Sequence, residues 1–448
     1  MMSIRIIFVT SDRKKKIKPI TLLLLLVCVI TDSTLNLTYA QSAETKKDST
    51  STSVNLKYRR SSLYTLMLDD SSRQYADAIR AGYNAYVISE KFNNHNLDTR
   101  MINSQAGVKD KKPFIDIFIS NNHVARNLVA KWFNRSAKGG FSMDTIAARG
   151  SYNASELDAK IARSTKRGLT ILQDAGVELI NNTFLVVSDF EYMTMEEYLS
   201  RIKKTTDAIA GLGGKLGATA KAFSDVNNSI SEATTGYVVT ATTYLYQLEW
   251  NDEVEAIMYE QYWTEDGSLN PERVKLFDNS DIFQLKFIGK EIDKALVPQW
   301  KAANKSDEVM IGIATKRALD ASIAKLQKKY EEFRIKTPMF TPDPVTAQIG
   351  LKEGIEKGDR FSVLEQRQDE DGRTYYKQIG TISVDGTQIW DNRFDVAEEE
   401  KQSNVNATLF KGGKEKYYTG LLIRQGATYS EKKRKPVPAV KENKSTNK

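Results

Sequence analysis

Short runs of β-branched and aromatic residues alternate with amphipathic helical segments along most of this chain, and this alternation limits the fold more than any other feature. Residues 63–68 and 183–190 each predict a buried strand. The longest helical pattern repeats at intervals of four and three residues, through Leu319, Ile323, Leu326, Tyr330 and Phe333. Elements in this order favour a layered mixed sheet covered by helices, of the α+β or α/β class, over residues 56–335.

Four further stretches complete this predicted domain. Residues 114–119 predict a strand, and residues 155–180 predict a helix. Residues 236–250 and 253–263 are rich in strand-forming residues and are separated by two polar residues, which predicts a hairpin. Residues 282–288 predict the next strand.

A proline-rich segment, residues 336–347, predicts a joint between two domains, because proline neither donates to a strand ladder nor continues a helix. Its prolines are Pro338, Pro342 and Pro344. The following residues, 348–430, contain short strand patterns separated by glycine turns. They predict a small SH3-like β-barrel.

The first forty residues have the order of a secretory signal peptide. Basic residues between 13 and 18 precede the apolar stretch 20–30, and Thr38, Tyr39 and Ala40 form a cleavage site. The apolar stretch is far shorter than the roughly 20 residues of a membrane-spanning helix. We therefore expect export, a disordered linker over residues 41–55, and no transmembrane helix in the mature chain. A lipid anchor on Cys28 is the alternative, although Val27 stands where a lipoprotein signal needs a small residue.

Charge is concentrated at the two ends of the chain. Of the net charge of +8, residues 1–40 contribute +4 and residues 431–448 contribute +5, which leaves −1 for residues 41–430. A nearly neutral body lacks the basic footprint of a nucleic-acid-binding protein, so we expect no nucleic-acid partner. Residues 431–448 predict a basic disordered tail, with attraction to phosphate-rich lipid or polysaccharide as the alternative.

Few residues offer catalytic or metal-binding chemistry. Cys28 is the single cysteine, and the two histidines are His95, expected in an exposed turn, and His123. This excludes a histidine-rich zinc site and leaves little for a Ser-His pair. Carboxylates gather at Asp189, Glu191, Glu196 and Glu197, which keeps a carboxylate-dependent glycan or peptidoglycan hydrolase as an alternative. We expect no cofactor and no metal, and favour a non-catalytic protein.

Two groups of residues are candidates for binding. The glycine-rich stretch 211–217, with Gly211, Gly213 and Gly214, lacks the spacing of a phosphate-binding loop and follows a helical segment where a strand is required. The second group is aromatic and belongs to the predicted hairpin: Tyr244, Tyr246, Trp250, Tyr259, Tyr262 and Trp263. Because alternate residues of a hairpin face a core, burial is the favoured interpretation of each aromatic residue.

The order of helix, strand, inserted segment, hairpin, strand and helix resembles the α/β domain of the curli-secretion-channel family over residues 60–335. Residues 345–425, and the opening segment 349–363 above all, are similar to the small β-barrel of the flagellar assembly T protein family. In that segment, the resemblance places Gly354, Gly358 and Asp359 in a tight turn. It places Ile355, Phe361 and Val363 in the barrel interior. The resemblance implies an envelope-associated accessory or assembly protein without an active site.

We therefore expect an exported, non-catalytic protein that acts in binding or assembly, in the periplasm or on the outer envelope surface of a Gram-negative-type cell. Its partner would be an envelope protein or a glycan, and self-association is a further expectation. A component of a secretion pore is a second alternative. It would require residues 195–235 to form amphipathic membrane strands, whereas their pattern is helical and glycine-rich.

Overall fold

The computed structural model describes residues 61–89, 91–104, 110–153, 177, 179–210, 234–300, 306–368, 374–392, 405–413, 417–419 and 421–426. The expected signal peptide 1–40, linker 41–55 and basic tail 431–448 lie outside these residues. So do the glycine-rich stretch 211–217, with Gly211, Gly213 and Gly214, and most of the predicted helix 155–180.

A mixed sheet forms the centre of the first part of the chain. β1 pairs in parallel with β4 on one side and with the short strands β2 and β3 on the other. β5 is antiparallel to β4, and β6 lies next to β5. The strands are β1 (Ser61–Asp69), β2 (Phe92–Asn94), β3 (Met101–Asn103), β4 (Thr183–Thr194), β5 (Thr234–Leu248) and β6 (Leu285–Trp300). The strands predicted at 63–68, 183–190 and 236–250 are confirmed.

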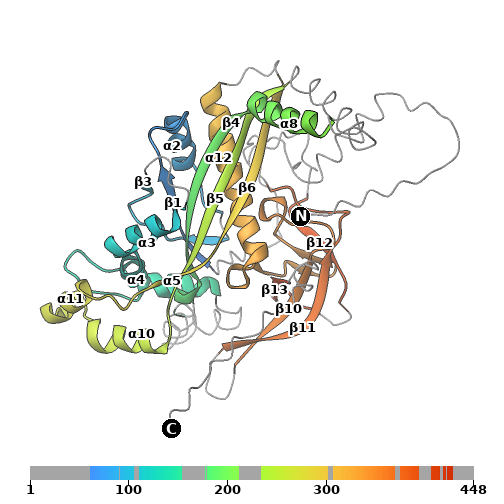
Figure 1. Ribbon diagram of the computed structural model, residues 1–448. Helices are drawn as coiled ribbons and strands as arrows, with labels where there is room; N and C mark the ends of the chain where they lie inside the picture. Colours follow the sequence, from blue (N-terminus) through green and yellow to red (C-terminus); the bar gives the residue numbers. More distant parts are fainter. Residues whose placement is uncertain are drawn as a thin grey trace, which may run out of the picture. The chain divides into compact units, whose positions relative to one another are not determined.

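Helices cover both faces of this sheet (Figure 1). On one face, α12 crosses α2 so closely that a Cβ atom on Gly82 would lie 2.8 Å from the Cα atom of Gly312. Phe333, just after α12, packs on Phe184 of β4 with ring centroids 4.7 Å apart. The helices are α2 (Ala76–Asn84), α3 (Lys112–Asn121), α4 (Val124–Trp132), α5 (Asp144–Asn153), α10 (Asp252–Ile257), α11 (Pro271–Asp278) and α12 (Asp307–Lys329). The long helix predicted before Phe333 is confirmed.

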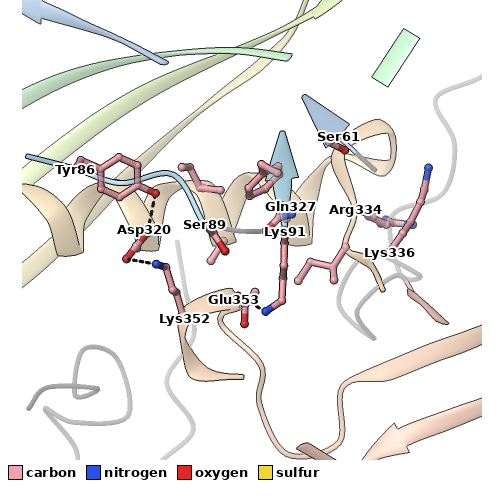
Figure 2. Close-up of a pocket in the computed structure, with 14 residues that line it drawn as sticks. Ser61, Tyr86, Ser89, Lys91, Asp320, Gln327, Arg334, Lys336, Lys352 and Glu353 are labelled. Carbon is pink, nitrogen blue, oxygen red and sulfur yellow. Dashed lines mark hydrogen bonds and ion pairs between the residues drawn. The ribbon is translucent and has the colours of Figure 1, made fainter. Parts of the chain in front are cut away.

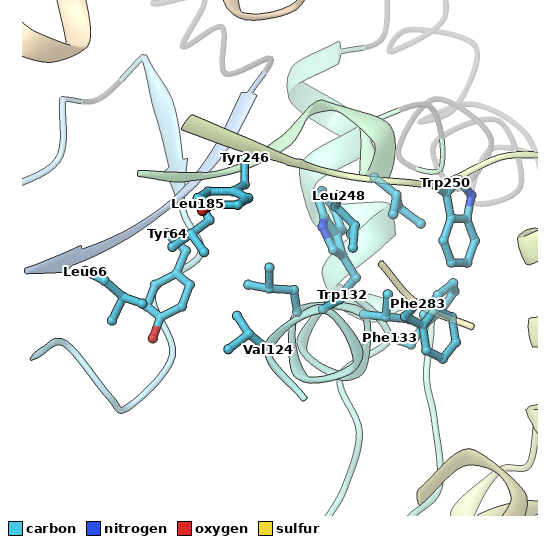
Figure 3. Packing of buried hydrophobic residues seen from close by; sticks show 14 of the residues in the cluster. Tyr64, Leu66, Val124, Trp132, Phe133, Leu185, Tyr246, Leu248, Trp250 and Phe283 are labelled. Carbon is cyan, nitrogen blue, oxygen red and sulfur yellow. The ribbon is translucent and has the colours of Figure 1, made fainter. Parts of the chain in front are cut away.

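The opposite face of the sheet carries a large cluster of buried hydrophobic residues (Figure 3). Alternate residues of β1 point to this face, and so do alternate residues of β4 and β5, because side chains alternate across a strand. They meet the buried face of α4, where Trp132 and Phe133 are fully buried. Trp132 Nε1 also donates a hydrogen bond of 2.8 Å to Thr183 Oγ1 at the start of β4. The α3 and α4 helices are thereby fixed to the sheet.

The strand predicted at residues 114–119 is wrong, because these residues belong to helix α3. Pro113 stands in the first turn of α3, where a helix tolerates proline. Phe114, Ile115, Phe118 and Ile119 pack on the core, at the spacing of one helix face. Ile117 is 60% exposed. An apolar run of this length fits either a strand or a helix, and packing against the sheet decides for the helix.

The hairpin predicted at residues 236–263 is also wrong in its second half. Residues 252–257 form α10, which continues into a π-helical turn at Met258–Tyr262. Asn251 caps this helix, since its Oδ1 atom accepts a hydrogen bond of 2.9 Å from the backbone of Val254. The acidic residues Asp252, Glu253 and Glu255 in the first turn also favour a helix, because they face its positive end.

The second sheet is antiparallel and curled, with the strand order β7-β13-β10-β11-β12-β9-β8. Ile355, Phe361 and Val363 are buried in its core, as expected. Gly354 and Gly358 have the positive φ angles, 66° and 87°, that the predicted turn beside Asp359 requires. The strands are β7 (Lys336–Pro338), β8 (Thr341–Pro342), β9 (Val345–Ala347), β10 (Arg360–Gln368), β11 (Thr374–Val384), β12 (Thr408–Lys411) and β13 (Leu422–Gln425).

The expected proline-rich joint, residues 336–347, contributes β7, β8 and β9 to this second sheet. Pro338 and Pro342 occupy short strands that hydrogen-bond through neighbouring residues. The chain is therefore an α+β protein with one mixed sheet and one antiparallel sheet. Helix α8 (Met195–Ala210), which the sequence predicts as helical, falls largely in a compact unit separate from both sheets. Among the described helices, none combines the length and apolarity needed to cross a membrane.

Candidate functional site

A polar groove of about 820 Å³ opens between α3, the start of α4 and the start of β6. This volume lies in the range of about 300–1,000 Å³ that is typical of ligand pockets. We call it the α3 groove. Its polar lining residues are Lys112, Asp116, Ser120, Asn121, His123, Arg126, Tyr246, Ser280, Asp281 and Gln284. Its apolar lining residues include Phe283 and Phe287.

The carboxylate of Asp116 lines the α3 groove and accepts two hydrogen bonds. Its Oδ1 atom accepts a hydrogen bond of 2.8 Å from the Tyr246 hydroxyl, and its Oδ2 atom accepts one of 2.5 Å from the Lys112 ammonium. Lys112 and Asp116 face each other because they are four residues apart in α3. Burial and the bond to Asp116 raise the pKa of Tyr246, so its hydroxyl keeps its proton and stays a donor.

An aromatic surface adjoins this polar group. The ring of Phe287 lies 5.2 Å from the ring of Tyr246, measured between centroids, and the Lys112 ammonium lies 4.7 Å from the Phe287 centroid. Phe287 is part of β6, and Tyr246 is part of β5. The sheet therefore supplies an aromatic floor, and α3 supplies the charged pair above it.

The other charged residues that line the α3 groove are Arg126 and Asp281, and His123 lies beside Asp281. Arg126 donates to the backbone carbonyl oxygens of Asp278 and Ser280. His123 has a left-handed backbone, with φ at 47°, and its Nδ1 atom lies 3.9 Å from Asp281. Of the charged side chains, Lys112 and Arg126 are balanced by Asp116 and Asp281. The α3 groove is therefore polar but carries no net charge with His123 neutral.

A second cavity has a different character. It measures about 40 Å³ and lies among α12, the segment after α2, and the turn at Leu351–Glu353 (Figure 2). The Asp320 carboxylate accepts a hydrogen bond of 2.8 Å from Tyr86 and lies 3.8 Å from the Lys352 ammonium. Burial raises the pKa of Asp320 to about 6, although Lys352 and Tyr86 oppose this shift. The cavity has room for about three or four water molecules at about 10–15 Å³ each, and it does not fit an organic substrate.

Two of the carboxylates considered for hydrolysis, Asp189 and Glu197, are engaged in ion pairs. Asp189 is 6% exposed and accepts two hydrogen bonds from Arg73, of 2.6 and 3.3 Å. Arg73 also lies 3.4 Å from Asp70, at the end of β1. Glu197 pairs with Arg201 within the separate helix α8. Asp189 therefore takes part in an ion-pair cluster at the ends of the parallel strands.

His95 lies in the core, and its predicted place in an exposed turn is wrong. Its Nδ1 atom accepts a hydrogen bond of 2.6 Å from Arg149, and its Nε2 atom donates one of 2.9 Å to the carbonyl oxygen of Leu128. Only the neutral ring with a proton on Nε2 fits both partners, because arginine can only donate and a carbonyl can only accept. Burial and the nearby Arg149 hold the pKa of His95 well below its usual value.

The predicted aromatic candidates lie mainly in the core. Tyr244 and Tyr246 are 2% exposed, and Trp250 and Tyr262 are also buried. Tyr259 and Trp263 are partly buried against the same cluster. Of this group, Tyr246 is the residue whose hydroxyl reaches the α3 groove. Gly354, Gly358 and Asp359 lie in the turn of the second sheet, away from the α3 groove.

Sequence reasoning missed Lys112, Asp116, Arg126 and Gln284 as site residues. The assignment of residues 114–119 to a strand placed Asp116 on a sheet face and separated it from Lys112. Pro113 was the available signal for a helix start, which would have brought the two charges together. No group of three or more metal-binding side chains occurs among the residues that the structure describes. Comparison with protein-family models and with curated proteins finds no match to this chain.

Proposed function

We propose that this chain is an exported, non-catalytic protein of the cell envelope that binds a neutral, hydroxyl-rich ligand, a glycan segment, in the α3 groove. The observation that carries the proposal is the balance of charge in this groove: with His123 neutral, Lys112 and Arg126 are matched in number by Asp116 and Asp281. An ionic ligand would therefore meet no net charge there. A neutral ligand with many hydroxyl groups can hydrogen-bond to paired charges and amides without displacing them, and its apolar ring faces can lie on Phe287.

Binding is favoured over hydrolysis by the hydrogen bonds of Asp116. Both oxygen atoms of Asp116 already accept hydrogen bonds, one of them from an ammonium group. A carboxylate held in this way is a fixed acceptor, as a binding site requires.

Export and envelope location are part of the same proposal, supported by the signal-peptide pattern of residues 1–40. The curled second sheet, with Ile355, Phe361 and Val363 in its core, is compatible with an SH3-like barrel in an accessory protein. Cell fractionation and the mass of the mature product test this part. The product is expected outside the cytosol and to begin at Gln41, and an intact leader on a cytosolic product would contradict it.

Calorimetric titration with a tetramer of β-linked N-acetylglucosamine tests the site. Lys112→Ala should weaken binding about tenfold, because it removes a charged donor and leaves Asp116 unbalanced. Lys286→Ala is the matched control, since Lys286 is an exposed residue of β6 that does not line the α3 groove. Equal weakening by both variants, or no binding to the wild type, would contradict the proposal.

A further inference from the structure

A second groove, of about 510 Å³, adjoins the corner between α3 and α4. We call it the α4 groove. Its polar lining residues include Asp98, Thr99, Asn122, Asn127, Lys131 and Asn134. It lies beside the segment between β2 and β3, on the other side of the corner from β6.

The residues of this corner line the two grooves in alternation. Ser120, Asn121 and His123 line the α3 groove, whereas Asn122 and Val124 line the α4 groove. Ala125 and Arg126 then line the α3 groove again, and Asn127 lines the α4 groove. Successive residues of the corner thus face opposite sides, and the corner is a narrow ridge with a groove along each flank.

The ridge is held in one conformation by its own side chains. The Asn122 amide donates a hydrogen bond of 2.9 Å to the carbonyl oxygen of Phe118, and the Asn127 amide donates one of 3.0 Å to the carbonyl oxygen of Asn122. His123 turns the chain between the helices with its left-handed backbone. A ridge fixed in this way loses little freedom when a ligand lies over it, which favours binding.

The α4 groove is similar to the α3 groove in its polar chemistry. Its charged lining residues are Asp98, Lys131 and Arg135, and Arg135 is balanced by Asp278, which lies outside the lining, at 2.9 Å. Both grooves are rich in amides and hydroxyl groups, and their charges are balanced. A ligand that satisfies one groove therefore has the chemistry to satisfy the other.

We infer that the ligand is a linear oligosaccharide that crosses the α3–α4 ridge and occupies both grooves. This inference rests on the proposed function of the α3 groove and adds the second subsite. A chain that fills both grooves gains the contacts of the second with a reduced entropic cost, because the first groove already holds it.

Calorimetry with the dimer and the hexamer of β-linked N-acetylglucosamine tests the second subsite. The hexamer should bind wild-type protein at least tenfold more tightly than the dimer. Asn127→Ala should remove most of this difference. Asp98→Ala, on the opposite wall of the α4 groove and outside the ridge, should do the same and leave the affinity for the dimer unchanged.

The outcomes separate the two proposals. Equal affinities for dimer and hexamer, or a length effect that survives both variants, would overturn the second subsite and leave the α3 groove standing. If neither oligomer binds, the proposed function fails together with this inference. Melting temperatures within the error of the wild type confirm that each variant is folded.

Discussion

The hydroxyl group of Tyr246 donates a hydrogen bond of 2.8 Å to Oδ1 of Asp116. The tyrosine ring is buried in the core between sheet and helices, while the carboxylate lies in the α3 groove. This contact joins β5 to α3 and fixes one hydrogen-bond acceptor of the α3 groove. The stability of the fold and the geometry of the site are therefore linked at one hydrogen bond.

Tyr246→Phe tests this link. The change removes the donor and keeps the ring, so it should lower the free energy of unfolding by about 1 kcal/mol in urea denaturation. In an Asp116→Ala background the same change should cost close to nothing, because the partner is already absent. A full cost in both backgrounds would show that the Tyr246 hydroxyl stabilises the fold through some other contact.

Arg73→Met should be strongly destabilising, by about 3 kcal/mol at neutral pH, because it leaves Asp189 buried without its cation. Arg201→Met is the control, since the Arg201–Glu197 pair is exposed and should contribute less than about 1 kcal/mol. Chemical denaturation at neutral pH measures both. Equal losses of stability in the two variants would contradict a stabilising role for the Arg73–Asp189 ion pair.

His95 should make the protein less stable in acid. Its folded pKa lies well below the unfolded value of about 6.5, so below that pH the unfolded chain binds a proton that the folded protein does not. The free energy of unfolding should fall by up to about 1.4 kcal/mol per pH unit from this group. His95→Gln should remove that slope between pH ~6.5 and ~5. An unchanged slope would mean that the ring takes up a proton in the folded state.

Asp320, in contrast to His95, should make the protein more stable in mild acid. Its folded pKa of about 6 lies above the usual value of 3.8, so between these values the folded protein binds the extra proton. The contribution of Asp320 to the free energy of unfolding therefore rises as the pH falls from about 6 to about 4. Asp320→Asn should abolish this contribution, so that the acid slope of the variant is steeper than that of the wild type. Denaturation curves between about pH 4 and pH 6 measure the free energy of unfolding of both proteins. The same pH dependence in wild type and variant would refute this prediction.

The elements that the sequence predicts correctly have long or unambiguous patterns. β1 and the first eight residues of β4 are mostly apolar and buried on both faces, and α12 has 23 residues with a repeated helical period. The turn at Gly354 and Gly358 is also predictable, because both positions need positive φ angles. In these places the local pattern and the tertiary packing favour the same structure.

The errors fall where a short apolar run fits two structures. Residues 114–119 and 253–263 are rich in strand-forming residues, but caps and packing against the sheet make them helical. The α3 groove could not be predicted, since Asp116, Tyr246 and Asp281 come from segments that only the fold brings together. The burial of His95 likewise depends on the pairing of β2 with β1, which places the following residue in the core.

Hydrogen–deuterium exchange with and without the N-acetylglucosamine tetramer tests the central claim, that the α3 groove is the ligand site, most directly. At saturating ligand, peptides from α3 and the start of β6 should exchange more slowly, and peptides from the second sheet should be unchanged. Unchanged exchange in α3, or protection confined to the second sheet, would contradict the account.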